Sequence, residues 1–568
     1  MSSAAKPNVI FILTDDQGYG DLSCLGNPVL HTPNLDQLYN ESVRCTDFHV
    51  APVCTPTRGE LLTGRDALYN GASFVCMGRS LLHPDLPTMA DIFADNDYYT
   101  GHFGKWHLGD NYPYRPQDRG FQETIHHPSW GITSAADYFG NDYFDDHYRH
   151  GDQIKQYQGY CTDIWFEEAM NWINRCQNQP FLAYIATNAP HGPLWVPDQY
   201  RDPYRNQVKA NEASFFGMIA NIDQNLGRLD QYLHQNGLHE NTILIFMTDN
   251  GTASGENVFN ADMRGKKSSL YEGGHRVPFF IRWPDGNIRD GRDVEGLTRG
   301  TDLLPTLIDL CELNLPDGLT FDGLSLADSL QTGQPVSTER VSVIQFGHPN
   351  EGIWGYTAED QAAVMWQNWR LVNGHELYNV NIDPGQNNDL STEHPDIVSQ
   401  LHDHYQAWWD GVGQNLNHYH PLTIGTANEN PMRLCSCDWA WVYADNQSNI
   451  RGCVMDSGTW HVEVAKEGLY SLTLRRWPQE SELGISTPAP VMQGVDGLWP
   501  EGKALPVASA WLQAGNVEQH QPVVSDATQV TFETELKTGA TTFKSWWYNS
   551  EGEALAGAYY LTVERLSS

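Results

Sequence analysis

The chain has 568 residues, and its 71 acidic and 34 basic side chains give a formal charge of −37 at neutral pH. A surface that binds nucleic acid needs basic residues to replace phosphate counterions, and anionic membranes attract basic segments. The charge therefore argues against both of these partners. It describes the whole surface and not one pocket, so a small anionic substrate is still possible.

We predict no membrane-spanning or targeting segment. The longest apolar runs, residues 9–13 and 243–247, are far shorter than the roughly 20 residues that cross a bilayer. Residues 1–13 contain one Lys and a very short apolar run, and they lack the apolar region and cleavage site of a signal peptide. The expected location is the cytoplasm for the sequence as given, or the periplasm or exterior if a signal has been removed.

Apolar strands alternate with amphipathic helices over the first 335 residues. In chain order, we expect a strand at 8–16, helices at 32–41, 88–96 and 160–177, a strand at 181–187, a helix at 212–236, and strands at 242–248 and 277–281. This alternation predicts an α/β fold whose mostly parallel sheet is sandwiched by helices. Ligands of such folds bind beyond the carboxyl ends of the strands.

The pattern changes twice farther along the chain. Residues 360–382 predict antiparallel strands and residues 395–409 a helix, which together form a small antiparallel α/β subdomain. Short strand-like runs at 459–464, 469–474, 529–535 and 558–563 predict a β-rich sandwich. The expected domains are a catalytic α/β domain at 1–335, a subdomain at 336–422 and a β-rich accessory domain at 423–568.

Two polar strand ends form the first candidate site. Asp15 and Asp16 follow the first strand, and Asp249 and Asn250 follow the strand at 242–248. Hard cations such as Ca²⁺ and Mg²⁺ prefer such oxygen ligands, although Asp and Asn after strands also form turns and helix caps. The two pairs together suggest a cation site.

A lone cysteine before a predicted helix is the second candidate site. Residues 54–65 read CTPTRGELLTGR. Spacing alone supports two interpretations of Cys54 equally, a thiolate stabilised by the helix dipole and a buried structural thiol. The pattern C-x-P-x-R followed by G-x-x-L-T-G-R resembles the signature of type I sulfatases of the alkaline-phosphatase-like superfamily, in which this Cys is oxidised to formylglycine.

Further segments resemble the same family in the same order. They are KWHLG at 105–109, APHGP at 189–193, KSSLYEGG at 267–274, and a closing hairpin from 376–378 to 383–384. Counting five residues back from Glu272 selects Lys267 and not Lys266 as the motif lysine. The resemblance covers roughly two thirds of the chain, and the residues after about 423 carry none of the motifs.

The resemblance implies hydrolysis of a sulfate ester. Hydrated formylglycine at position 54 offers one hydroxyl to attack sulfur and a second through which sulfate is released. Arg58 and Lys105 would anchor this diol, and His107 would orient or deprotonate it. His191 and Lys267 would hold sulfate, with His191 protonating the leaving oxygen. The implied catalytic set is Cys54, Arg58, Lys105, His107, His191 and Lys267, and the implied ligands of one Ca²⁺ are Asp15, Asp16, Asp249, Asn250 and Cys54.

The resemblance also implies a formylglycine-generating maturation enzyme as a partner, and it leaves the substrate open. We favour a bacterial enzyme acting on a sulfated carbohydrate of marine algae, such as carrageenan. A phosphodiesterase or phosphonate monoester hydrolase of the same superfamily is one alternative, and a catalytically silent sugar-binding homologue is another.

The remaining expectations concern aromatic and cysteine residues. The insert at 122–158 either shapes the pocket or packs internally through Trp130, Tyr138, Phe139, Tyr143, Phe144 and Tyr148. Rim positions are assigned to Arg119, His348 and Trp354. Cys435, Cys437 and Cys453, with His461 nearby, could bind a metal, but packing or one disulfide is favoured.

Overall fold

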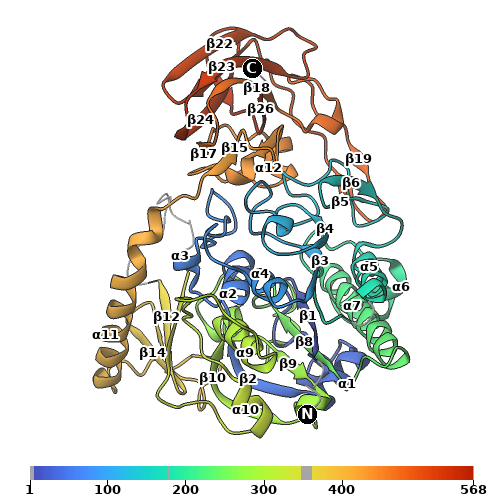
Figure 1. The fold of residues 1–568 in the computed structure, drawn as a ribbon, viewed down its shortest axis with the longest axis vertical. Coiled ribbons are helices and arrows are strands. Elements are labelled where there is room, and N and C mark those ends of the chain that lie inside the picture. The colour runs from blue at the N-terminus through green and yellow to red at the C-terminus, as the bar shows by residue number, and fades with distance from the viewer. Residues whose placement is uncertain (1–5, 177–178, 347–360, 567–568) are drawn as a thin grey trace.

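The computed structural model describes residues 6–176, 179–346 and 361–566. The chain forms two lobes, with the C-terminal residues in the upper one and the rest in the lower one (Figure 1). Two of the expected rim residues, His348 and Trp354, lie outside the described residues. No helix in the described part is long and apolar enough to cross a membrane.

A ten-stranded mixed sheet forms the centre of the lower lobe. Its order is β10 (Asp293–Arg299), β2 (Val43–His49), β9 (Phe279–Arg282), β8 (Thr242–Thr248), β1 (Asn8–Thr14), β7 (Phe181–Ala186), β3 (Tyr99–Lys105), β4 (Glu123–His127), β5 (His147–His150) and β6 (Gln153–Gln156). The adjacent strands β8, β1, β7, β3 and β4 run parallel. The predicted mostly parallel α/β sheet is thus confirmed, with β9 and β5 running against the others.

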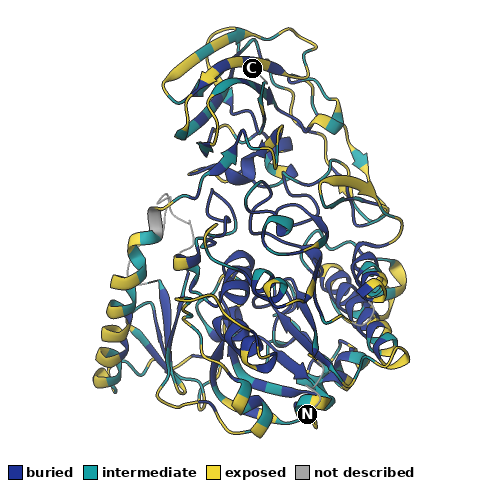
Figure 2. Cartoon of the chain, in the orientation of Figure 1, coloured by how far each residue is buried: buried dark blue, intermediate teal, exposed yellow. Residues whose placement is uncertain are grey.

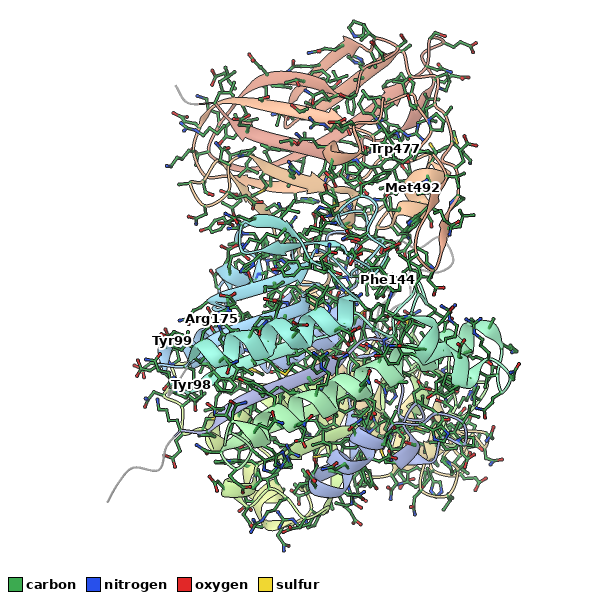
Figure 3. The ribbon with its side chains drawn as sticks, turned by 90° about the vertical axis from the view of Figure 1, so that its right-hand side faces the viewer. Tyr98, Tyr99, Phe144, Arg175, Trp477 and Met492 are labelled. Atoms are coloured by element: carbon green, nitrogen blue, oxygen red, sulfur yellow. The ribbon has the colours of Figure 1, made fainter. Side chains whose placement is uncertain are left out.

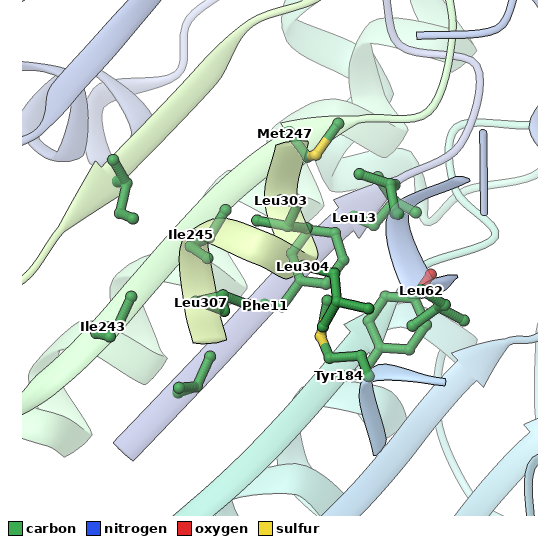
Figure 4. Close-up of a cluster of buried hydrophobic side chains, with 14 of the residues drawn as sticks. Phe11, Leu13, Leu62, Tyr184, Ile243, Ile245, Met247, Leu303, Leu304 and Leu307 are labelled. Carbon is green, nitrogen blue, oxygen red and sulfur yellow. The ribbon is translucent and has the colours of Figure 1, made fainter. Parts of the chain in front are cut away.

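Helices cover both faces of this sheet because its central strands are apolar on both sides. One face of β1 packs Phe11 and Leu13 beneath α2 (Cys54–Thr63), α4 (Met89–Asp95) and α9 (Leu303–Leu310). Figure 4 shows part of this cluster, with Leu303, Leu304 and Leu307 lying over β1 and β8. The opposite face packs Ile10 and Ile12 against α1 (Pro33–Glu41), α5 (Cys161–Cys176) and α7 (Ala210–Gln235). The alternation along β1 follows the two-residue period of a strand.

The expected helices and strands lie within a few residues of the observed ones. Thr88, expected as the first residue of a helix, instead caps α4 through a capping box with Asp91. The strand expected at 277–281 begins later, at Phe279, because Pro278 has no backbone N–H to donate. Short helices complete this lobe: α3 (Ala67–Asn70), α6 (Asp198–Arg201), α8 (Glu272–His275) and α10 (Ala327–Thr332).

A small antiparallel sheet follows in the chain. It consists of β11 (Val341–Gln345), β12 (Ala362–Trp366), β13 (Trp369–Val372) and β14 (Glu376–Asn379), and it packs against α11 (Pro395–Val412). Most of α11 is exposed or half-buried, as its colouring in Figure 2 shows.

The upper lobe contains two facing sheets. One has the order β15 (Leu422–Ile424), β17 (Trp460–Val464), β24 (Gly539–Tyr548), β21 (Ser509–Ala514) and β22 (Val517–Pro522), with β25 (Ala554–Ala556) beside β24. The other has the order β16 (Met432–Cys435), β26 (Tyr560–Arg565), β18 (Gly468–Arg475) and β23 (Val530–Leu536). Strict alternation of buried and exposed residues along β23 is typical of a two-layer sandwich. The β-rich C-terminal region is confirmed, whereas the domain boundaries at 335 and 422 remain predictions.

The three cysteines of this region are free thiols. His461, the nearest candidate for a fourth metal ligand, stacks on Tyr419 with ring centroids 4.8 Å apart. The favoured packing role agrees with their burial, since Cys435, Cys437 and Cys453 all belong to the core of the upper lobe.

One hydrophobic cluster spans the junction of the two lobes. Leu81, Tyr114 and Ala135 of the lower lobe cluster with residues of the sandwich. In the side view of Figure 3, Phe144 lies near the junction, and Trp477 and Met492 lie above it. Met492 belongs to a hairpin of β19 (Met492–Gln493) and β20 (Leu498–Trp499), and its sulfur accepts from Arg451 of α12 (Gln447–Gly452) at 3.2 Å. The junction is therefore packed, and it can position residues of one lobe against the other.

Candidate active site

The ends of β1 and β8 bring four polar side chains together. These strands pair in parallel with Thr14 opposite Thr248, so the residues that follow each strand leave the sheet side by side. Oδ1 of Asp249 accepts a hydrogen bond from the backbone N–H of Asp16 at 3.1 Å. The Asn250 amide nitrogen donates to Oδ1 of Asp16 at 3.0 Å. With Asp15, all four residues are buried.

Two buried cations lie against these acids. Arg58, on α2, donates to Oδ2 of Asp249 at 2.7 Å and lies 3.7 Å from Oδ1 of Asp15. Lys105, the last residue of β3, donates to Oδ2 of Asp15 at 2.6 Å. The carbonyl of Lys105 also accepts from Arg58 at 3.2 Å, which connects α2 to the end of β3. Buried charges need such partners, because an unpaired charge in the protein interior is very costly.

Three acids so close together fit a cation site. Burial and the nearby Asp15 raise the pKa of Asp249 to about 7 despite Arg58. Oδ1 of Asp15 and Oδ1 of Asn250 are buried without a hydrogen-bond partner. Ligand atoms of Asp15, Asp16 and Cys54 all lie within 4.8 Å of one another. Crowded carboxylates and unpartnered oxygens are the donor set that a hard cation such as Ca²⁺ requires.

Cys54 is the first residue of α2 and is almost fully buried. Burial raises the pKa of its thiol, and Lys105 and Lys267 only partly oppose that shift. Of the two interpretations that spacing supports, the stabilised thiolate is therefore disfavoured. Nζ of Lys267 lies 3.9 Å from the Cys54 sulfur and 2.5 Å from Oδ1 of Asp16.

Lys267 and its sequence neighbour Lys266 have different environments. Lys266 is exposed and pairs with Glu256 at 2.5 Å, outside the acid cluster. Burial alone would raise the pKa of Asp16, but Lys267, His191 and Lys105 outweigh it and hold that pKa well below its usual value.

The two motif histidines present different nitrogen atoms. His107 Nε2 lies 2.8 Å from the Val75 carbonyl, so this nitrogen carries the proton and the buried Nδ1 keeps a free lone pair. Burial holds the pKa of His107 well below its usual value. His191 Nδ1 lies 2.7 Å from the Gly192 carbonyl, and its Nε2 lies 3.7 Å from Oδ2 of Asp16. Burial lowers the pKa of His191 to about 4, so both imidazoles are neutral at neutral pH.

Three residues around this cluster adopt left-handed backbone conformations. The φ angles are 69° at Asp16, 60° at His107 and 68° at Ser268. Such conformations are uncommon for residues other than glycine and tend to occur at functional sites.

A cavity of about 540 Å³ opens above Cys54. Cys54, His107, His191 and Lys267 line it, so the structure brings together four of the six expected catalytic side chains at one surface. Arg58 and Lys105 lie behind them, against the acids. Their individual roles in catalysis remain predictions.

Sequence reasoning missed other residues of the cavity wall. Phe74, Val75, Ser268 and Phe346 contribute to the wall near Cys54, and Tyr443, Asp445 and Asn446 come from the upper lobe. The only sequence signal for the last group is the alternation Trp441-x-Tyr443-x-Asp445, which resembles an ordinary strand.

Most of the aromatic residues in the insert at 122–158 pack internally and do not shape the cavity. Trp130 lines the cavity, and its ring centroid lies 5.0 Å from that of His191. The other five aromatic residues pack elsewhere; for example, Tyr148 packs on Trp165 and Phe144 on Tyr160. Arg119 is buried and donates to the carbonyls of His83 and Leu86, so the expectation that it lies on the rim is wrong.

Comparison with known proteins agrees with this geometry. The family model described as Sulfatase matches residues 7–313. Arylsulfatase J of Mus musculus is 26% identical in an alignment of 465 positions, and this alignment covers 70% of this chain and 75% of that protein. The ulvan-active sulfatase of Formosa agariphila is 28% identical and covers 68% of this chain and 77% of its own length. The crystal structure of Ps i-CgsB in complex with k-i-k-neocarrahexaose has a TM-score of 0.65 and 25% identity, and it covers 73% of this chain and 95% of that one.

Proposed function

Because the chain belongs to the sulfatase family and is a sulfuric ester hydrolase, we propose that it desulfates a carbohydrate, with Cys54 matured to formylglycine and Ca²⁺ as the metal. The observation that carries this proposal is the position of Cys54, at the base of a cavity and between Lys267 and the buried acids. The cavity thus brings the precursor of a nucleophile, Cys54, close to a cation that could bind an anionic ester, Lys267, and to a candidate metal site.

The buried thiol supports the need for maturation. A thiol whose pKa is raised by burial is a poor nucleophile at neutral pH. Formylglycine at position 54 would supply, once hydrated, both the attacking hydroxyl and the second hydroxyl that allows sulfate to leave. The free lone pair on Nδ1 of His107 can accept a hydrogen bond from a hydroxyl at position 54 and so orient that hydroxyl.

The acid cluster supports Ca²⁺. Asp15, Asp16, Asp249 and Asn250 would hold the ion with residue 54, and the ion would polarise the sulfate oxygens. The three acids are matched in number by Arg58, Lys105 and Lys267, so these six formal charges sum to zero. A bound divalent cation would leave this end of the cavity positive and suited to an anionic ester.

His191 and Lys267 are placed to act on the substrate. The Lys267 side chain is 20% exposed and lines the cavity, where it would bind a sulfate oxygen. His191 is neutral, with Nδ1 directed to a carbonyl and Nε2 available to the cavity. An anionic ester beside Nε2 would favour its protonation, after which His191 could donate that proton to the leaving oxygen.

A sulfated oligosaccharide of the algal type, such as carrageenan, is the substrate class we propose. The names of the similar proteins support it, since one is an ulvan-active sulfatase and another binds neocarrahexaose. The cavity also combines the aromatic rings of Trp130 and Tyr443 with polar side chains, a mixture that suits sugar rings.

Two measurements test this proposal. Co-expression with a formylglycine-generating enzyme should convert the Cys54 peptide to the mass of the aldehyde, and sulfate should then be released from one or more members of a sulfated oligosaccharide panel. An unmodified thiol under these conditions would overturn the formylglycine assignment. Faster hydrolysis of a phosphodiester or a phosphonate monoester than of every sulfate ester would overturn the proposed substrate class.

A further inference from the structure

Part of the cavity wall comes from the upper lobe. Residues 440–446 run between β16 and α12, and Tyr443, Asp445 and Asn446 line the same cavity as Cys54. Figure 1 shows α12 at the junction of the two lobes, above the loops of the lower one. A segment almost 180 positions after Lys267 thus completes the site.

This segment is held rigidly by hydrogen bonds to the insert at 122–158. The Asp445 carbonyl accepts from the backbone N–H of Ala135 at 2.7 Å and from the Trp130 indole at 3.2 Å. The next residue but one, Gln447, donates its backbone N–H to the Thr133 carbonyl at 2.9 Å. The Asn446 side chain caps α12 by accepting from the backbone N–H of Asn449. The wall is therefore preorganised, as a recognition surface needs to be.

Asp445 has an unusual environment for a carboxylate. It is only 3% exposed, and one carboxyl oxygen accepts from the Asn446 amide at 2.9 Å. Its other side-chain partners are the Tyr443 hydroxyl and the Trp130 indole, so these three partners are all neutral. Burial raises the pKa of Asp445 to about 6, which leaves the group largely ionised at neutral pH. A buried carboxylate without a cation is costly, and hydrogen bonds from substrate hydroxyls would lower that cost.

The wall is close to the end of the cavity that we assign to sulfate. Burial raises the pKa of Tyr443, and the Lys267 ammonium opposes that shift, which places the phenol within electrostatic range of Lys267. The cavity volume of about 540 Å³ lies within the range of roughly 300–1,000 Å³ that is usual for small-ligand sites. A sugar ring whose sulfate binds at Lys267 would therefore present its other substituents to this wall.

We propose that Asp445, supported by Tyr443 and Asn446, is a specificity-determining residue that binds the free hydroxyls of the sulfated ring and rejects a second anionic group on it. The inference rests on the proposed function and adds the substrate class: a ring with one sulfate, free hydroxyls and no uronate or further sulfate. An ionised carboxylate accepts hydroxyl hydrogen bonds strongly and repels a sulfate or carboxylate placed against it. The accessory lobe thus supplies selectivity, and the lower lobe supplies the catalytic groups.

The test compares three substrates and four proteins. The substrates are 4-nitrophenyl sulfate, a galactose-based oligosaccharide with one sulfate on the terminal ring, and the same sugar with a second sulfate on that ring. The proteins are wild type, Asp445→Asn, Tyr443→Phe and the control Asp526→Asn, which removes an exposed carboxylate from the same lobe. Thermal unfolding checks that each variant is folded.

Asp445→Asn should reduce the preference for the singly over the doubly sulfated sugar by about tenfold or more, because it removes the repulsive charge and keeps the shape. Tyr443→Phe should lower the ratio of kcat/KM for the singly sulfated sugar to kcat/KM for 4-nitrophenyl sulfate, and Asp526→Asn should change neither ratio. Proportional losses on all three substrates in Asp445→Asn, or an unchanged preference, would overturn the inference and indicate a structural role.

Sugar binding to a catalytically inactive variant tests this inference separately from the proposed function. In Cys54→Ala protein, calorimetry should show tighter binding of the singly sulfated sugar, and the added Asp445→Asn change should remove that preference. If the wild type releases sulfate from no substrate but this binding pattern holds, the proposed function fails and the subsite stands. If turnover occurs but binding shows no dependence on Asp445, the subsite fails alone.

Discussion

Two adjacent lysines offer a matched test of the site. Lys267 lies 2.5 Å from Oδ1 of Asp16 and 3.9 Å from the Cys54 sulfur, whereas Lys266 is exposed and pairs with Glu256. Replacing either lysine with Met removes the same charge and keeps a similar chain length. Only the change at 267 removes a cation from the cavity, so the pair isolates the effect of position.

The expected loss follows from the distance. Two unit charges about 4 Å apart interact by about 4 kcal/mol at the effective dielectric constant of a partly buried site. A transition state that places part of a unit charge on the sulfuryl oxygens would lose about 2–4 kcal/mol, or roughly 30- to 1,000-fold in kcat/KM. Lys266→Met removes an exposed pair with a contribution of at most about 1 kcal/mol to stability, and kcat/KM should stay within about twofold of wild type.

The assay is sulfate release from 4-nitrophenyl sulfate and from a sulfated oligosaccharide, measured on protein with matured residue 54. Lys267→Met also leaves Asp16 without its nearest cation, so thermal unfolding has to show that this variant is folded. Lys267→Arg, which keeps the charge, should recover part of the lost activity. Equal losses in the two Met variants, or full activity in Lys267→Met, would refute the assignment of Lys267 to the sulfate.

Three further outcomes are expected. A chelator should abolish sulfate release and lower the melting temperature, because Asp15, Asp16 and Asp249 then crowd a buried site without a cation; retention of both properties would contradict the Ca²⁺ proposal. Burial raises the pKa of Asp438 to about 8, against about 3.9 in an unfolded chain, so the folded state binds this proton more tightly and loses stability as pH rises between these values. Asp438→Asn should therefore raise the melting temperature more at pH 8 than at pH 5, and a pH-independent difference would argue against the buried charge. With a formal charge of −37, the chain should repel highly sulfated oligosaccharides at low salt, so their kcat/KM should increase as NaCl screens the repulsion, and a fall with salt would oppose this reasoning.

The sequence predicts the lower lobe well because its signals are local. Residues 243–247 form a continuous apolar run that lies within β8, since a central parallel strand is buried on both faces. The candidate metal ligands follow directly after β1 and β8, and parallel pairing places their carboxyl ends side by side. A polar motif that follows a predicted parallel strand therefore predicts where its side chains lie, namely at the carboxyl edge of the sheet.

Other features depend on packing between distant segments, and no local pattern reveals them. Tyr443 and Asp445 reach the cavity because the upper lobe packs on the insert at 122–158, through contacts such as Trp130 to Asp445. The composition of that insert is equally typical of a sugar-binding surface and of a hydrophobic core. The structure assigns most of its aromatic residues to packing, as Tyr148 against Trp165 illustrates.

The charge of the chain can now be related to its site. Arg58, Lys105 and Lys267 are each bound to an acid of the cluster, so the protein alone offers the cavity no excess positive charge. Under the Ca²⁺ proposal, the attraction for an anionic ester would then depend on the cation that the acids would hold. Linkage makes this dependence reciprocal: the cation strengthens sulfate binding by the factor by which sulfate strengthens cation binding. On this proposal, an acidic protein would bind sulfate locally through a cation held by its own acids.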